Sequence, residues 1–168
     1  MNPTAQISRA ETVLQAILDR FAANVAASGT PAIGTPLAGL SAGPEADLGR
    51  VQSRKLPWLT VTLTETARRQ TTADGQIENR ALLDLTLYDA AHGGKAGTLL
   101  AHRWAAWIES ILIPAGERNS EPPLNGLADA LEPQETSIDS GGLGFSALTV
   151  RTRFRLTYST DLGTPFTA

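Results

Sequence analysis

The residues from Leu59 to Tyr88 read LTVTLTETARRQTTADGQIENRALLDLTLY, and this stretch decides the fold. Near its two ends apolar residues alternate with polar ones: Leu59, Val61 and Leu63, then Leu83, Leu85 and Leu87. Alternation with a period of two is typical of strands that bury one face. Asp74-Gly75 between them is a strong hairpin signal. The stretch therefore predicts two antiparallel strands joined by a tight turn.

The length of the turn sets the register of this hairpin. A two-residue turn would place apolar residues opposite threonines on both faces. A three-residue loop, Ala73–Gly75, instead pairs Leu63 with Leu85, and it also pairs Val61 with Leu87. Because a slip of one residue moves every side chain to the other face, we predict the three-residue loop, with its glycine in the left-handed conformation of a bulged turn. The tip is polar and is expected to project from the body.

Amphipathic helices are predicted on either side of the hairpin. Apolar residues recur at spacings of three and four from Ile7 to Val25, with Thr4 or Ser8 as the cap and Gly29 as the stop. A second apolar stripe with two tryptophans runs from about Gly97 to Leu112.

Two more strands are expected near the C-terminus, around Gln134–Asp139 and Phe145–Ser159. The order of helix, two strands, helix and two strands predicts an α+β fold in one domain, residues 1–168. Its sheet would be mainly antiparallel, with the two amphipathic helices packed on one face.

A Gly/Pro-rich segment separates the first helix from the hairpin. Residues 30–55 contain no hydrophobic periodicity, and loops longer than about 15 residues are uncommon inside compact domains. We interpret this segment as an extended surface arm that becomes ordered in an assembly.

Composition excludes several classes of function. The chain has 168 residues, 42% of them hydrophobic, a formal net charge of −3 and no cysteine. The charge balance gives no reason to expect a nucleic-acid-binding protein, and the lack of cysteine excludes disulfides, thiolate catalysis and the usual structural zinc sites. The sequence contains neither a visible secretory signal nor a run of about 20 apolar residues that could span a membrane.

One motif resembles a hydrolase site. Gly39–Gly43 matches the G-x-S-x-G pattern, in which a serine nucleophile is held on a sharp turn between a strand and a helix. Ser41 would then act with His92 or His102. The segment lies within the Gly/Pro-rich arm, so a loop without catalytic function is the favoured interpretation.

Two other patterns are candidate sites for small ligands. Gly93–Thr98 lies between a strand and a helix, as a phosphate-binding loop does, but Ala90 and Ala96 occupy positions where the P-loop needs glycine and Ser/Thr. A tight connection between the strand and the helix is therefore the favoured interpretation. The two histidines lack the spacing of a metal pair, even with Asp89 close by. We therefore predict no catalytic, cofactor-binding or metal-binding residues and a protein that is not an enzyme.

A row of arginines is the most prominent polar feature. Arg151, Arg153 and Arg155 alternate with apolar residues, so they share one face of the last strand, with Asp84 or Glu65 as candidate cross-strand partners. In an oligomer the row would meet an acidic neighbour or line a channel. With the hairpin tip it gives the predicted interface set: Arg68, Arg69, Asp74, Gly75, Arg80, Arg151, Arg153 and Arg155.

These features together resemble the tail terminator proteins of long-tailed bacteriophages. The resemblance covers the order of elements over most of the chain: leading helix, Gly/Pro-rich arm, LPWLTV, LLDLTLYD, a helix with tryptophans and the closing strand VRTRFRLTYST. The closing strand is its most specific part.

The resemblance implies a structural virion protein without catalytic residues or cofactors. Such a protein forms a ring, expected to be a hexamer, that caps the tail tube, stops its polymerisation and joins it to the head-completion or neck proteins. Its partners would be copies of itself, the tail tube protein and a neck protein, with no membrane and no sequence-specific nucleic acid, although DNA would pass through the lumen. Its place would be the tail or neck of a virion assembled in the host cytoplasm. A different neck or tail-tube component, such as a head-tail joining protein, is the alternative.

Overall fold

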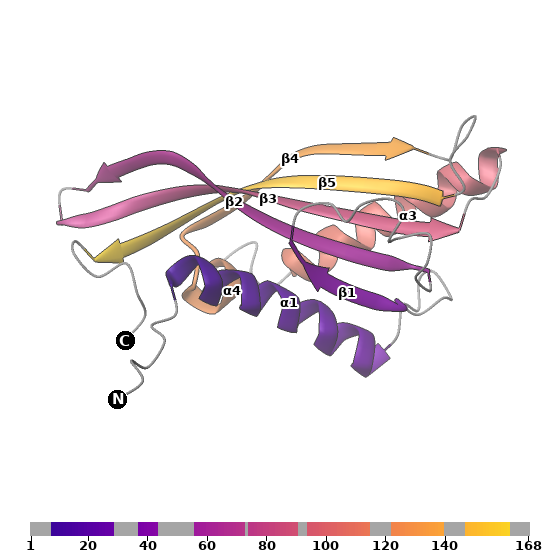
Figure 1. Ribbon diagram of the computed structural model, residues 1–168, viewed down its shortest axis with the longest axis horizontal. Coiled ribbons are helices and arrows are strands. Elements are labelled where there is room, and N and C mark those ends of the chain that lie inside the picture. Colours follow the sequence, from indigo (N-terminus) through magenta and orange to yellow (C-terminus); the bar gives the residue numbers. More distant parts are fainter. Residues whose placement is uncertain are drawn as a thin grey trace.

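The structure, a computed structural model, describes residues 8–28, 37–43, 56–72, 74–90, 94–114, 122–139 and 147–161. Its elements form one sheet with helices on one face (Figure 1). In chain order they are α1 (Arg9–Ser28), β1 (Gly39–Ala42), β2 (Trp58–Thr71), β3 (Gln76–Ala90), α3 (Gly94–Leu112), α4 (Pro123–Gly126), β4 (Ala130–Asp139) and β5 (Ala147–Asp161).

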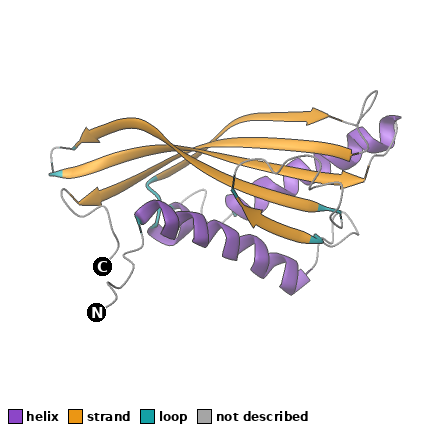
Figure 2. Ribbon diagram, in the orientation of Figure 1, coloured by secondary structure: helices purple, strands orange, loops and turns teal. Residues whose placement is uncertain are grey.

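The sheet has five strands in the order β1-β2-β3-β5-β4. All neighbouring pairs are antiparallel except β1 and β2, which run parallel. Figure 2 shows the strands as one twisted layer, with the long helices beneath it. The predicted α+β class, with a mainly antiparallel sheet and helices on one face, is confirmed.

The hairpin between β2 and β3 has the predicted loop but a different register near the body. The amide of Gly75 donates to the carbonyl of Thr72 at 3.1 Å, and Gly75 has a φ of 77°, the left-handed conformation that glycine adopts most readily. Between Thr66 and Gln70 the register shifts. Leu63 therefore pairs with Leu83, and not with Leu85 as predicted.

The companion pairing changes in the same way, since Val61 lies opposite Leu85 and not Leu87. The displacement is two residues. Side chains alternate with a period of two, so each one stays on the face predicted for it. The bulge thus changes the partners without changing the face.

The core lies between one face of the sheet and the two long helices. The buried side of α3 packs Trp104, Ile108 and Leu112 against the sheet, and the ring of Trp107 lies 5.6 Å from that of Phe21 in α1. The core also contains side chains of α1 and the central strands: Val13, Ile17, Phe21, Leu59, Val61, Leu83, Leu85, Leu87, Val150, Phe154 and Leu156. We call the sheet face toward these helices the helix face and the opposite one the outer face.

Both helices begin close to the predicted positions. α1 begins after Ser8, whose hydroxyl accepts the amide of Glu11 at 3.2 Å, while the Glu11 carboxylate accepts the amide of Ser8 at 2.7 Å. This reciprocal pair is a capping box. These bonds to the backbone and then the hydroxyl of Ser8 lower the pKa of Glu11 below its usual value. α3 begins at Gly94, three residues before the predicted Gly97.

The predicted arm is partly a strand. Within residues 30–55, Gly39–Ala42 forms β1 and pairs with the start of β2, while residues 30–36 and 44–55 lie outside the described part of the chain. The prediction of an arm without regular structure is therefore wrong for these four residues. β4 is longer than predicted, since it begins at Ala130, whereas β5 has its bounds two residues later than predicted, at Ala147 and Asp161.

The hairpin projects as expected. Figure 1 shows that the turn end of β2 and β3, together with the end of β5, extends beyond the helices. Arg9 of α1 donates to the carbonyls of Gly126 and Leu127, both at 3.4 Å, which holds the start of α1 against α4. The body of the protein thus ends near α4, and the strand ends continue past it.

Candidate assembly surfaces

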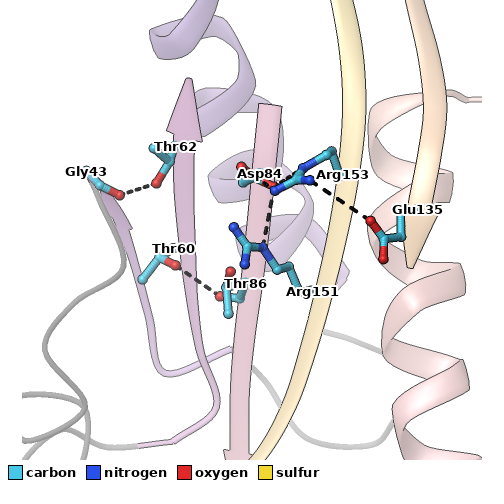
Figure 3. Close-up of polar contacts among 8 residues, drawn as sticks. All are labelled: Gly43, Thr60, Thr62, Asp84, Thr86, Glu135, Arg151 and Arg153. Atoms are coloured by element: carbon cyan, nitrogen blue, oxygen red, sulfur yellow. Dashed lines mark hydrogen bonds and ion pairs between the residues drawn. The ribbon is translucent and has the colours of Figure 1, made fainter. Parts of the chain in front are cut away.

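The arginine row lies on the outer face of β5, and acidic residues lie on both neighbouring strands. Arg153 is opposite Asp84 on β3 and opposite Glu135 on β4, while Arg155 is opposite Glu132. Directly opposed residues of antiparallel strands point to the same side of the sheet, so these groups form a ladder across three strands. Figure 3 shows its centre, where Arg151 and Arg153 converge on Asp84.

The contacts around Asp84 are close. Nε of Arg153 lies 2.8 Å from Oδ1 of Asp84, and Nε of Arg151 lies 3.4 Å from the same oxygen. The side chain of Asp84 is only 16% exposed. The hydrogen bond with Asp84, followed by the charge of that carboxylate, raises the pKa of Arg153. Asp84 is therefore the central anion of this cluster.

Contacts toward β4 are longer and more exposed. Arg153 lies 4.0 Å from Glu135, and Arg155 lies 3.7 Å from Glu132 and 3.3 Å from the amide oxygen of Gln134. The side chains of Arg155 and Glu132 are 53% and 59% exposed. Ion pairs this exposed contribute little to stability. A shallow hollow lined by Glu135, Ser137, Arg151 and Arg153 lies between β4 and β5.

Of the two predicted partners for the arginine row, Asp84 is confirmed and Glu65 is wrong. Glu65 lies opposite Ala81, a core residue, and so points to the helix face. There its carboxylate accepts a hydrogen bond from the hydroxyl of Tyr158. Neither Glu132 nor Glu135 was predicted as a partner of the row: Glu132 lies before the predicted start of its strand at Gln134, and Glu135 lies within the predicted strand.

The predicted hairpin residues lie near the end of the projecting strands. Asp74 and Gly75 are exposed at the turn, and Arg80 is exposed on β3, where its Nε donates to Glu78 at 2.8 Å. Arg68 and Arg69 belong to the bulged part of β2, and their side chains lie outside the described residues. The structure therefore divides the predicted interface set between the hairpin tip and the outer face of β5.

Ser41 does not occupy a nucleophile elbow. It lies inside β1, opposite Thr60, and its hydroxyl accepts the indole N–H of Trp58 at 3.0 Å. Pairing with Thr60 places it on the outer face, whereas His102 is exposed on α3, across the sheet. His92 lies outside the described residues. Ser41 and His102 thus do not form a catalytic pair.

The glycine-rich loop gives no evidence of a ligand site. Gly94 opens α3 with a φ of 64°, Lys95 is exposed, and Gly93 lies outside the described residues. Asp89 is 6% exposed, and its carboxylate accepts the indole N–H of Trp104 at 2.8 Å, a structural contact. In the parts of the chain that the structure describes, no acidic and histidine side chains group as metal ligands do. Within the same parts, the helices lack the length and apolarity needed to cross a membrane.

Comparison with solved structures identifies a neighbour in fold. The chain is similar to a chain of the virion of a native gene transfer agent particle, with a TM-score of 0.57 and 16% sequence identity. The match covers 88% of this chain and 94% of that chain. No protein-family model matches the sequence, and no curated protein matches it significantly. At this identity the likeness shows a shared fold.

Proposed function

We propose that this chain is a structural virion protein, a tail terminator that forms a ring on the end of the tail tube. The shared fold with a chain of a gene transfer agent virion carries the proposal, because it spans nearly the whole length of both chains. The sequence resemblance to tail terminators supports it independently, through the order of elements and the closing strand. In this role the protein acts by contacts with other chains and not by catalysis.

A terminator ring needs a contact that repeats from one copy to the next and closes, together with surfaces left free for tube and neck. The protein has features that suit this role. Strands β2, β3 and β5 reach beyond the helices and offer a projecting contact (Figure 1). The hairpin tip carries Asp74, Gly75 and Arg80 in exposed positions. We propose that it contacts the tube or a neck protein, while the bodies of six copies form the ring.

The outer face of β5 is the candidate for the lumen. Its arginines are matched by Asp84, Glu132 and Glu135, so the face presents alternating charges and not an uninterrupted cationic surface. A phosphate backbone binds cationic surfaces strongly, and a protein through which DNA must slide benefits from weaker attraction. The ladder thus suits a channel that DNA crosses without being held.

Assembly with purified tube subunits tests the proposal. Mass photometry and negative-stain images should show rings of a single size, rings at tube ends, and tubes that stop elongating once the protein is added. Protein that stays monomeric with tubes present, and tubes that grow unchanged, would contradict it. Rings that bind head-completion proteins but leave tube growth unaffected would instead favour the alternative, a head-tail joining protein.

Ser41→Ala provides a matched control. The substitution removes the hydroxyl that accepts the bond from Trp58, yet leaves the elements proposed for assembly untouched. Rings and tube capping should persist. An esterase activity in the parent protein that disappears in this variant would reject the non-enzymatic role.

A further inference from the structure

The solvent-facing side of α3 is cationic and carries an open apolar residue. Lys95, His102 and Arg103 are exposed on it, and the acidic residue of the helix, Glu109, is partly buried with an interaction of its own. Leu99 lies one turn from Lys95 and from Arg103 and is 48% exposed. Among the described residues, Leu99 is the large hydrophobic side chain that is exposed to solvent. We call this set the α3 stripe.

α1 has an exposed stripe of opposite sign. Glu11, Gln15 and Asp19 follow one another at intervals of four residues, and exposed Ala22 continues the same face. The basic residues of α1 are turned elsewhere: Arg9 bonds to carbonyls beside α4, and Arg20 donates to the carbonyl of Leu112 at 3.2 Å. We call the exposed set the α1 stripe.

The spacing of charges on the two stripes matches. Glu11 and Asp19 are eight residues apart, as are Lys95 and Arg103. At about 1.5 Å of rise per residue each pair spans about 12 Å along its helix axis. Two such helices can therefore lie alongside with both charge pairs facing each other, which places Leu99 opposite Gln15, midway between Glu11 and Asp19.

The two stripes lie on two different helices, which pack side by side on one face of the sheet and contact each other. α1 contacts β1 and β2 at one end of the strand order, whereas α3 contacts β5 and β4 at the other end. Figure 1 shows the helices diverging under the twisted sheet. Two different complementary surfaces on one subunit generate head-to-tail contacts, which close into a ring when the rotation between copies allows it.

The sheet edges are poorly suited to the same task. β4 forms one edge, and it carries Pro133, which has no amide hydrogen, beside a register irregularity that ends at Glu135. Edges of this kind resist pairing with another strand. The opposite edge, β1, offers four residues. Extension of the sheet from copy to copy is therefore disfavoured.

We propose that neighbouring copies of this chain meet head to tail, with the α3 stripe of one copy docked on the α1 stripe of the next. This inference rests on the proposed ring and names the surfaces that build it. Leu99 is the apolar centre of the contact, and the flanking charges set its register and its sensitivity to salt.

Site-directed cross-linking tests the contact directly, since the chain has no cysteine of its own. Leu99→Cys combined with Gln15→Cys, treated with a short bismaleimide, should give a ladder of covalent oligomers on denaturing gels. Each single variant should give at most dimers. The control pair, Leu99→Cys with Thr64→Cys, places the second thiol on the exposed outer face of β2 and should give no ladder.

Charge reversal provides the second arm. The double variant Lys95→Glu with Arg103→Glu should raise the concentration at which rings form by at least about ten-fold, because it sets like charges against each other. Adding Gln15→Lys and Asp19→Lys should recover most of the loss while leaving the capping residue Glu11 in place. Two glutamates at Thr64 and Thr66, on the outer face, should leave ring formation unchanged.

The outcomes separate this inference from the function on which it rests. Rings that survive the charge reversal, without a ladder in the Leu99–Gln15 pair, overturn the head-to-tail contact and leave the terminator role standing. If the charge-reversed variant forms intact rings and loses only tube binding, the α3 stripe contacts the tube protein. That result also overturns the head-to-tail contact between copies. A parent protein that forms no rings even with tubes present contradicts the function itself.

Discussion

Replacing Trp104 with phenylalanine should destabilise the protein more than the loss of volume alone would. Trp104 is fully buried in α3, and its indole N–H donates to Oδ2 of Asp89 at 2.8 Å. The other carboxylate oxygen of Asp89 accepts the amide of Ala90 at 2.7 Å. This carboxylate at the end of β3 thus joins the strand to the helix that follows it.

Two effects set the size of the loss. A hydrogen bond to a charged group contributes about 1.5–3 kcal/mol, and the Asp89 carboxylate, 6% exposed, has little access to water as a replacement donor. The smaller ring also leaves a cavity, which costs about 1 kcal/mol. The sum is about 2.5–4 kcal/mol, and for a domain of this size it lowers Tm by roughly 5–15 °C.

Urea and thermal unfolding of Trp104→Phe and Trp107→Phe measure the difference. Trp107 is 8% exposed and packs edge-on against Trp104 at 5.5 Å, so its substitution removes the same atoms without breaking the bond to Asp89. Trp107→Phe should lower the free energy of unfolding by about 1 kcal/mol. In Asp89→Asn the amide group cannot accept both donors, and in a double-mutant cycle it should couple to Trp104→Phe by about 1 kcal/mol or more. Equal costs for the two tryptophans, or no coupling, would refute the reasoning.

Three further predictions concern the turn, the cap and the ladder. Gly75→Val should destabilise by about 1–2 kcal/mol in urea unfolding, because a β-branched residue is strained at a φ of 77°, and Gly75→Asn should cost less. The folded state depresses the pKa of Glu11, so the stability that Glu11 contributes is present above its unfolded pKa, about 4.5, and is lost as pH falls through its folded pKa. Glu11→Gln should therefore remove that part of the decrease in Tm at acid pH. Asp84→Ala should lower Tm clearly, since Arg153 loses its close partner, whereas Glu132→Ala on the exposed rim should change it within experimental error.

Local patterns predicted the hairpin turn, and a nonlocal feature altered its register. Alternating leucines and the Asp74-Gly75 pair defined the loop and the left-handed glycine. The bulge between Thr66 and Gln70 lies where the sequence is polar on both faces, so no apolar alternation constrains the pairing there. Only the combined packing of β2, β3 and β5 fixes the two-residue displacement.

Short strands and ion-pair partners were harder to predict for related reasons. The four residues of β1 are too few to show a period, and they are defined by pairing with β2 at the sheet edge. Glu65 was wrongly offered as an arginine partner, although it follows Leu63 by two residues and so shares its face. Glu132 was missed because Pro133 interrupts the pattern of β4. In each case the deciding information lies in a neighbouring strand.

The faces of this molecule differ in how far their charges are satisfied within one copy. On the outer face Asp84, Glu132 and Glu135 lie within ion-pair distance of the arginine row, so that cationic row needs no partner from another chain. The exposed sides of the two long helices carry opposite charges. The buried bond between Asp89 and Trp104 joins α3 to the end of β3, and this anchoring would lower the conformational cost of the proposed docking of its exposed side. The ion-paired charges of the sheet and the complementary charges of the two helices thus favour the proposed contact through the helices over one through the sheet.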